Sequence, residues 1–225
     1  MRVAVVTVGD ELLAGDVTNT NAAWLGTRLT ERGATVERML TVPDEEAAIA
    51  ETVAAYSDEY DAVVVTGGLG PTHDDRTMAG VTAAFDRPLV EHPDAVAYFD
   101  DHDSYSRDDL TEGTTHLPEG ARMLPNDEGV APGAVVENVY VLPGVPEEMR
   151  AMFESVEGEF GGEVRHVEVI EADAPESALV ERLRRVEEEF GVTVGSYPGE
   201  RVRIKLQHTD PGTVRDAREW LAARL

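Results

Sequence analysis

A run of glycines followed by two aspartates has the composition of a phosphate-binding loop. Glycine has no side chain, so its backbone N–H groups can approach an anion closely, and a helix that begins after the run adds partial positive charge. Adjacent carboxylates are ligands for the divalent metal ions that often accompany phosphates. The sequence therefore predicts a phosphate site with a metal-binding acidic pair. The glycines are Gly67, Gly68 and Gly70, the hydroxyl donor is Thr72, and the carboxylates are Asp74 and Asp75.

Each part of this run also has a purely structural interpretation. Glycines after a strand often form only a tight turn, and a carboxylate just before Thr77 can cap a helix. We expect one aspartate to cap the helix and the other to act in chemistry, either as a metal ligand or as a base toward water. The length of the run, with two acids at its end, favours a functional site over a plain turn.

Several other turns and helix starts carry residues that could face the same ligand. Residues that follow a strand are well placed for binding in an open sheet. A carboxylate or amide there can instead cap a helix, and a Pro-Gly turn can merely orient the helix that follows. We expect Asp44 to cap the helix that begins beside it. The full set of candidates is Gly9, Glu11, Asn21, Asp44, Gly144 and Pro146.

Alternating strands and helices are expected to position these residues. Apolar runs predict buried strands at 3–8, 34–42 and 61–66. Helices are expected at 19–32, 44–57 and 77–85, and 9–16 is expected to be a turn-rich connection. This order predicts a parallel sheet with helices on both faces, with ligands bound at the carboxyl ends of its strands. The loops at 9–16, 42–46 and 67–77 should therefore meet around one pocket.

Two domains are expected, separated by a glycine-rich and acidic stretch at 157–162. The first, 1–160, contains every candidate site residue. The second, 163–225, has the pattern of a small two-layer β-α-β-β-α domain. Within the first domain, the acidic segment 92–110 is expected to be helical and to form an exposed flap or an oligomer contact.

The composition restricts the partners and the compartment. Acidic residues number 45 against 19 basic ones, the net charge is −26, and Lys205 is the single lysine. Such a surface is a poor partner for nucleic acid, and it suggests adaptation to high salt, as in a halophilic protein. The chain has no cysteine, and no apolar stretch approaches the length of a membrane span. We therefore expect a cytoplasmic protein that does not bind membranes.

An ordered set of motifs extends along nearly the whole chain. The motifs are Gly9-Asp10-Glu11-Leu12-Leu13-x-Gly15, Thr20-Asn21-Ala22, Val42-Pro43-Asp44, Gly67-Gly68-Leu69-Gly70-Pro71-Thr72-x-Asp74-Asp75-x-Thr77, Leu124-Pro125-Asn126-x-x-Gly129-x-Ala131-Pro132-Gly133, Leu142-Pro143-Gly144-Val145-Pro146-x-Glu148-Met149, Glu176-Ser177 and Ser196-Tyr197-Pro198. Together they resemble the molybdopterin-binding domain family, and most of all the amino-terminal domain of competence-damage-inducible protein A. The resemblance implies a three-layer α/β/α fold, a small trailing α+β domain, and a nucleotide or pterin ligand that contains phosphate.

The resemblance also implies roles for individual residues. Asp75 is the first candidate for catalysis and metal binding, with Asp74 as the second metal ligand. Asp44 matches an acidic position that related adenylyl-transferring domains use near their ligand, and Glu11 is a carboxylate that the family motif retains. In longer members a nicotinamide-mononucleotide deamidase domain follows, and its activity is not expected of residues 1–225.

Three functions remain open on the sequence alone. The resemblance favours a hydrolase of the competence-damage-inducible type that cleaves the pyrophosphate bond of ADP-ribose or a related dinucleotide with Mg²⁺, Mn²⁺ or Co²⁺. The second is a protein of molybdenum cofactor biosynthesis that binds molybdopterin or transfers adenylate to it. The third is a noncatalytic nucleotide-sensing protein. By analogy with domains of this fold, a homo-oligomer is expected.

Overall fold

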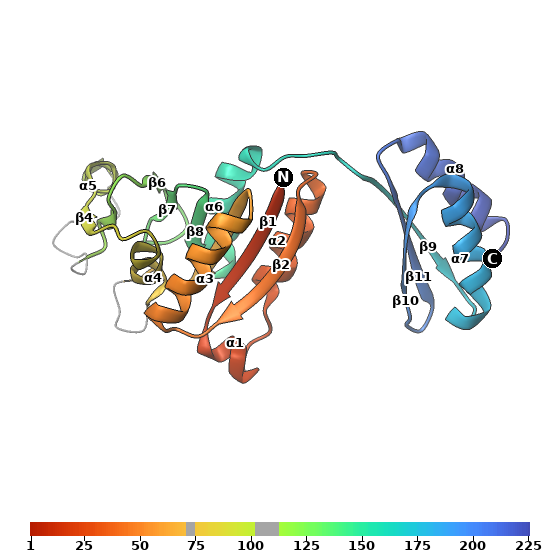
Figure 1. The fold of residues 1–225 in the computed structure, drawn as a ribbon, viewed down its shortest axis with the longest axis horizontal. Helices are drawn as coiled ribbons and strands as arrows, with labels where there is room; N and C mark the ends of the chain where they lie inside the picture. The colour runs from red at the N-terminus through yellow and green to blue at the C-terminus, as the bar shows by residue number, and fades with distance from the viewer. Residues whose placement is uncertain (71–74, 102–112) are drawn as a thin grey trace. The chain divides into compact units, whose positions relative to one another are not determined.

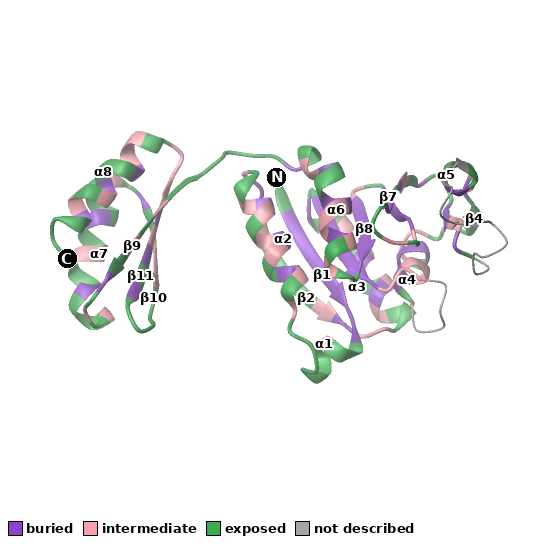
Figure 2. Cartoon of the chain, turned by 180° about the vertical axis from the view of Figure 1, so that it is seen from behind, coloured by how far each residue is buried: buried purple, intermediate pink, exposed green. Residues whose placement is uncertain are grey.

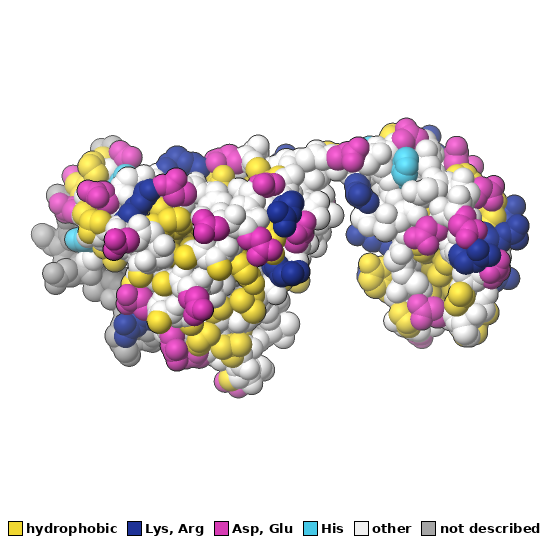
Figure 3. Space-filling model, viewed as in Figure 1, with side chains coloured by type: hydrophobic (Ala, Val, Ile, Leu, Met, Phe, Trp, Pro, Cys, Tyr) yellow, Lys and Arg dark blue, Asp and Glu magenta, His cyan; other side chains and the backbone are white. Residues whose placement is uncertain are grey.

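The structure is a computed structural model of the 225-residue chain, and it describes residues 1–70, 75–101 and 113–225. Within these ranges the chain forms two compact units, Met1–Gly162 and Glu163–Leu225, each with its own sheet and core (Figure 1). Most of the acidic excess belongs to the first unit, whereas acidic and basic residues are nearly balanced in the second. Figure 3 shows basic and acidic side chains interspersed on the visible face of the second unit.

A six-stranded sheet in the order β2-β1-β3-β8-β7-β6 forms the centre of the first unit. The four strands β2, β1, β3 and β8 are parallel to one another, and a hairpin adds β7 and β6 in antiparallel pairing. The sheet is therefore mixed but mostly parallel, which confirms the predicted fold class. The strands are β1 Arg2–Val8, β2 Thr35–Val42, β3 Ala62–Gly67, β6 Arg122–Leu124, β7 Gly133–Val136 and β8 Val139–Pro143.

Helices cover both faces of this sheet because successive side chains of a strand point to opposite sides. On β1, Val3 and Val5 belong to one core, together with α2 (Thr20–Glu31) and α6 (Pro146–Val156). The intervening Ala4 and Val6 belong to a second core, together with residues of α3 and α4. Helix α3 is Glu46–Glu59 and α4 is Thr77–Ala84. Figure 2 shows the buried strands between helices whose outer sides are exposed. The predicted three-layer arrangement is confirmed.

Two local predictions need correction, and one small sheet was not predicted. The stretch after β1 contains a short helix, α1 (Asp10–Ala14), in place of a turn, and Gly15 ends it at φ +78°. Strand β2 is mostly exposed where a buried strand was expected, because it is an edge strand that pairs with β1 alone. A small two-stranded antiparallel sheet of β4 (Leu89–Glu91) and β5 (His116–Pro118), which are far apart in the sequence, was not predicted.

The predicted acidic helix is confirmed over part of its length. Helix α5 extends over Pro93–Asp101. The remainder of that prediction, residues 102–110, lies outside the described residues, as does its role as a flap or oligomer contact. Among the helices in the described ranges, none is long and apolar enough to cross a membrane.

The second unit has the predicted β-α-β-β-α order. Its antiparallel sheet has the order β10-β11-β9, and two helices bury Leu179, Val186 and Leu221 against it. The carboxylate of Asp210 caps the last helix by accepting a hydrogen bond from the Thr213 N–H (2.7 Å). The elements are β9 His166–Ala172, α7 Glu176–Phe190, β10 Thr193–Tyr197, β11 Val202–His208 and α8 Pro211–Ala222.

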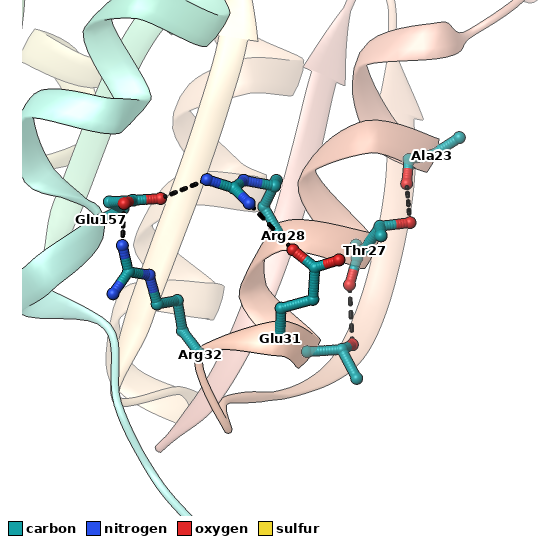
Figure 4. A network of polar contacts seen from close by, with 8 residues as sticks. Ala23, Thr27, Arg28, Glu31, Arg32 and Glu157 are labelled. Carbon is teal, nitrogen blue, oxygen red and sulfur yellow. Dashed lines mark hydrogen bonds and ion pairs between the residues drawn. The ribbon is translucent and has the colours of Figure 1, made fainter. Parts of the chain in front are cut away.

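A cluster of ion pairs fixes the end of the first unit (Figure 4). Arg28 and Arg32, near the end of α2, both contact the carboxylate of Glu157, which begins a 3₁₀ turn over Glu157–Glu159. Arg28 also pairs with Glu31 on its own helix (3.0 Å). The Glu157 side chain is 16% exposed and that of Glu31 is 56% exposed. The contact that joins two elements is therefore better shielded from water than the contact within one helix.

Candidate functional site

The loops after β1, β2, β3 and β8 surround one cavity of about 550 Å³ at the carboxyl ends of these strands. The expected convergence of the three loops is confirmed, because Glu11, Asp44, Gly68 and Asp75 all line this space. A fifth wall comes from the loop before β7. The lining is Val8, Glu11, Asp44, Gly67, Gly68, Leu69, Gly70, Asp75, Gly129, Val130, Ala131, Pro143, Gly144, Val145 and Glu148.

The carboxylate of Asp75 lies against the backbone of the glycine run. A Cβ atom added to Gly68 would overlap Asp75 Oδ1, and one added to Gly70 would lie 2.6 Å from Oδ2. Any larger residue at either position would displace this carboxylate. The absence of side chains at Gly68 and Gly70 therefore fixes where the Asp75 charge sits in the cavity wall.

Helix α4 does not use Asp75 as its N-cap residue. That position belongs to Arg76, whose side chain makes no capping hydrogen bond. Thr72 and Asp74, predicted as the hydroxyl donor and the second metal ligand, lie outside the described residues. Asp75 is thus the one member of the predicted acidic pair that the structure places.

Asp44 does not cap the next helix, contrary to the prediction. Helix α3 begins at Glu46 with Glu45 as its N-cap residue and without a side-chain capping bond. The Asp44 carboxylate instead accepts a hydrogen bond from the backbone N–H of Asp10 (2.9 Å), and Asp10 Oδ1 accepts a longer one from the Asp44 N–H (3.4 Å). The two aspartates tie the loop after β1 to the loop after β2.

Negative charge accumulates around Asp44. Burial is the main cause that raises the pKa of its carboxyl above the usual value. The charges of Asp10, Glu11 and Asp75 raise this pKa further, whereas the hydrogen bond from the Asp10 N–H lowers it. These carboxylates are close enough to influence one another. Within the described ranges, however, no three acidic or histidine side chains are already arranged to hold a metal ion.

Asn21 connects helix α2 to the ends of β3 and β8. Its Nδ2 donates to the Gly144 carbonyl (2.8 Å) and to Thr66 Oγ1 (3.3 Å), and that hydroxyl in turn donates to the Pro143 carbonyl (2.5 Å). The Asn21 amide oxygen is buried without a hydrogen-bond partner in the described structure. The amide nitrogen of Asn21 therefore has a structural role, whereas no described residue donates a hydrogen bond to its amide oxygen.

The remaining predicted residues divide between the walls of the site and its support. Gly67 and Gly144 line the main cavity and touch each other: a Cβ on Gly144 would lie 3.2 Å from the Gly67 carbonyl carbon. Asn21 and Pro146 line a smaller recess of about 110 Å³ that shares Glu11 and Gly144 with the main cavity. Gly9 lines neither space. Its N–H bonds to the Val42 carbonyl (3.1 Å), so it supports the loops without facing the cavity.

Sequence reasoning missed one carboxylate in the cavity wall. Glu148, in the first turn of α6, accepts a hydrogen bond from Asn126 Nδ2 (2.7 Å) and lies against Gly129. Two signals could have found it: its place in the motif that ends Pro146-x-Glu148-Met149, and its position in a helix that starts at the end of a strand.

A second cavity of about 350 Å³ adjoins the first, and its lining holds one carboxylate where that of the first holds four. Leu69, Gly70 and Asp75 line both spaces. Its other walls include the apolar side chains of Met78, Leu89, Leu117 and Pro132. A ligand with a charged part and a flat apolar part could occupy the two cavities together.

Comparison with known proteins agrees with this geometry. A family model described as "Probable molybdopterin binding domain" matches residues 4–160. A protein of Archaeoglobus fulgidus is 38% identical over 219 residues, which are 96% of this chain and 95% of that protein. A CinA-like protein of Salinibacter ruber is 38% identical over 91% of this chain, which spans about half (54%) of that longer protein.

A solved structure supports the same assignment. The crystal structure of "the protein CinA with unknown function" from Thermoplasma acidophilum has a TM-score of 0.65 and 34% identity. The match covers 72% of this chain and 99% of that one. The chain therefore belongs to the molybdopterin-binding domain family and is similar to its CinA-like members.

Proposed function

We propose that the first unit binds the diphosphate of a nucleotide in the 550 Å³ cavity and hydrolyses it with the help of a divalent cation. ADP-ribose or a related dinucleotide is the proposed substrate. The observation that carries this proposal is the composition of the cavity wall. Glycine backbone and four carboxylates, Glu11, Asp44, Asp75 and Glu148, form much of it, and no described lining residue is Lys or Arg.

A phosphate cannot enter such a wall without a compensating positive charge. Two like charges a few ångströms apart repel strongly in a partly dehydrated site. Mg²⁺ and similar ions bind through one or two carboxylates, with the remaining positions filled by water and substrate phosphates. The lack of a ready three-ligand cluster among the described residues is compatible with that mode. Asp75, with Glu11, supplies the hard oxygen ligands that such an ion requires.

The proposed roles of the chain's own groups follow from their positions. Backbone N–H groups of the glycine run bind the phosphate oxygens. A water molecule attacks one phosphorus atom, the bond to the bridging oxygen breaks, and two monophosphates leave. Asp44 accepts the proton of the attacking water, a role that its raised pKa favours. When bound, the divalent ion offsets the charge of the diphosphate and makes phosphorus more open to attack.

The direct test is hydrolysis of ADP-ribose in molar KCl with Mg²⁺, Mn²⁺ or Co²⁺. We expect AMP and ribose 5-phosphate, loss of turnover without the divalent ion, and a loss of about a hundredfold or more in Asp75→Asn. Asp16→Asn is the matched control, because Asp16 is an exposed aspartate next to α1 that does not line the cavity. Absence of turnover with every ion, or full activity of Asp75→Asn, would reject the hydrolase.

Molybdopterin binding is the second candidate function. The description of the matching family model favours it, and the adjoining 350 Å³ cavity offers room for a ring. Its test is adenylation of molybdopterin in the presence of ATP and Mg²⁺. Formation of adenylylated molybdopterin, together with no hydrolysis of ADP-ribose, would reverse the order of the two proposals.

A further inference from the structure

Glu148 is a cavity carboxylate that the proposed phosphate chemistry does not use. It lies in the first turn of α6, where the helix dipole stabilises its negative charge. It lines the 550 Å³ cavity but not the 350 Å³ cavity beside it. A group bound by Glu148 therefore belongs to the part of a ligand that stays in the 550 Å³ cavity.

A buried amide holds the Glu148 carboxylate in place. Asn126 is 2% exposed, and its Nδ2 donates both to Glu148 Oε2 (2.7 Å) and to the Ala131 carbonyl (2.9 Å). A Cβ added to Gly129 would overlap the carboxylate, so the missing side chain at that position provides the room that it occupies. The position of Glu148 is thus set by two residues of the loop before β7.

The other oxygen, Oε1, receives no hydrogen bond from any residue that the structure describes. A carboxylate only accepts hydrogen bonds. Because the divalent ion is assigned to Asp75 and Glu11, the ligand group opposite Glu148 is a hydrogen-bond donor and not a bare phosphate oxygen. The flat base of a nucleotide suits the 350 Å³ cavity, which has several apolar side chains and a single carboxylate, so the sugar hydroxyls are the donors that face Glu148.

We propose that Glu148 accepts hydrogen bonds from the 2′- and 3′-hydroxyls of a ribose whose phosphates lie on the glycine run. Glu148 is thereby the residue that selects ribonucleotides over ligands that lack this pair of hydroxyls. The inference rests on the proposed nucleotide binding. It specifies that the ribose is the part of the ligand that contacts Glu148.

The test compares the affinities of ADP and 2′,3′-dideoxyADP by calorimetry, with Mg²⁺ and molar KCl. For the unmodified chain we expect ADP to bind about tenfold more tightly or better, the effect of a hydrogen bond to a charged acceptor. In Glu148→Ala this ratio falls to about one, while the affinity for 2′,3′-dideoxyADP is kept. Glu147→Ala is the matched control, because Glu147 is exposed in the same helical turn and does not line the cavity.

The other outcomes separate this inference from the proposed function. Equal binding of ADP and 2′,3′-dideoxyADP by the unmodified chain overturns the role of Glu148 and leaves nucleotide binding intact. A preference for GDP over inosine diphosphate that Glu148→Ala removes shows that Glu148 reads the amino edge of a base, which also overturns it. If neither ADP nor GDP binds, the proposed function fails and this inference fails with it.

Discussion

Asp10 and Asp44 exchange hydrogen bonds between the ends of two neighbouring strands. Each presents a carboxylate oxygen to the backbone N–H of the other, at 2.9 Å for the Asp10 N–H and 3.4 Å for the Asp44 N–H. The pair fixes the spacing of two loops at the cavity, but it also brings two negative charges together. Ligand binding by these loops and a cost in stability thus arise from the same contact.

The first prediction concerns the stability cost of the Asp44 charge. Burial and neighbouring carboxylates raise its pKa in the folded state, so the folded protein holds this proton more tightly than the unfolded chain. Stability from this group is therefore present below the unfolded pKa and is lost as pH rises through the folded pKa. Without divalent ions, Asp44→Asn should be slightly more stable at pH 7, by less than about 1 kcal/mol, and no more stable at pH 3.

Thermal unfolding at both pH values measures this difference. The amide that replaces the Asp44 carboxylate would still offer an oxygen to the Asp10 N–H, so the variant removes mainly the charge. Added Mg²⁺ should reduce the advantage of Asp44→Asn, because the ion offsets the charge in the unmodified chain. If Asp44→Asn were less stable than the unmodified chain, and by the same amount at pH 7 and pH 3, this account would be contradicted.

The second prediction concerns the glycine run. Gly68→Ala should weaken Mg²⁺-dependent nucleotide binding by about tenfold or more, because its Cβ would displace the Asp75 carboxylate. Calorimetry with ADP gives the affinity. Gly158→Ala is the matched control, since a Cβ there would meet no atom within 4 Å. Equal affinity of Gly68→Ala and the control would show that the position of Asp75 does not matter for binding.

The third prediction concerns the ion pairs at the end of the first unit. Glu157→Gln should lower the free energy of unfolding by about 1–2 kcal/mol at low salt, because two arginines lose a shielded partner. Glu31→Gln removes an exposed partner of the same Arg28 and should cost less than about 0.5 kcal/mol. Denaturant unfolding of the first unit measures both. Equal losses in the two variants would mean that shielding has no effect.

The fourth prediction concerns salt. The net charge of −26 produces self-repulsion that salt screens, and most of the acidic excess belongs to the first unit. The melting temperature of the chain should therefore rise between low salt and molar KCl. Two resolved transitions should separate the units, with the larger rise in the first. A chain equally stable at both salt concentrations would reject adaptation to high salt.

The sequence was sufficient for the architecture and for the place of the site. The apolar runs at Val3–Val8 and Ala62–Val65, each closely followed by glycine, predict parallel strands and the edge where ligands bind. The order of strands and helices then brings Glu11, Asp44, Gly68 and Asp75 to one cavity. This inference works because it needs only periodicity and topology.

Contacts between distant residues could not be predicted in this way. Asp44 precedes a helix and has the sequence signature of a cap, yet a backbone N–H 34 positions earlier holds its carboxylate. Glu148 is one acid among 45, and its partner Asn126 precedes it by 22 positions. Strands β4 and β5 have three residues each, too few to show an alternating pattern.

Because β7 is antiparallel to β8, the cavity is lined by two kinds of loop: loops that follow a strand, and one loop that precedes a strand. In a wholly parallel sheet, every loop at this edge would leave a strand. Here β7 is antiparallel to β8, so the loop that enters β7 at Gly133 stands beside the loops that leave β1 and β3. Substitutions in that entering loop would alter ligand choice while leaving the glycine run untouched. Relatives could thus share one catalytic chemistry and differ in substrate through changes in the loop before β7 alone.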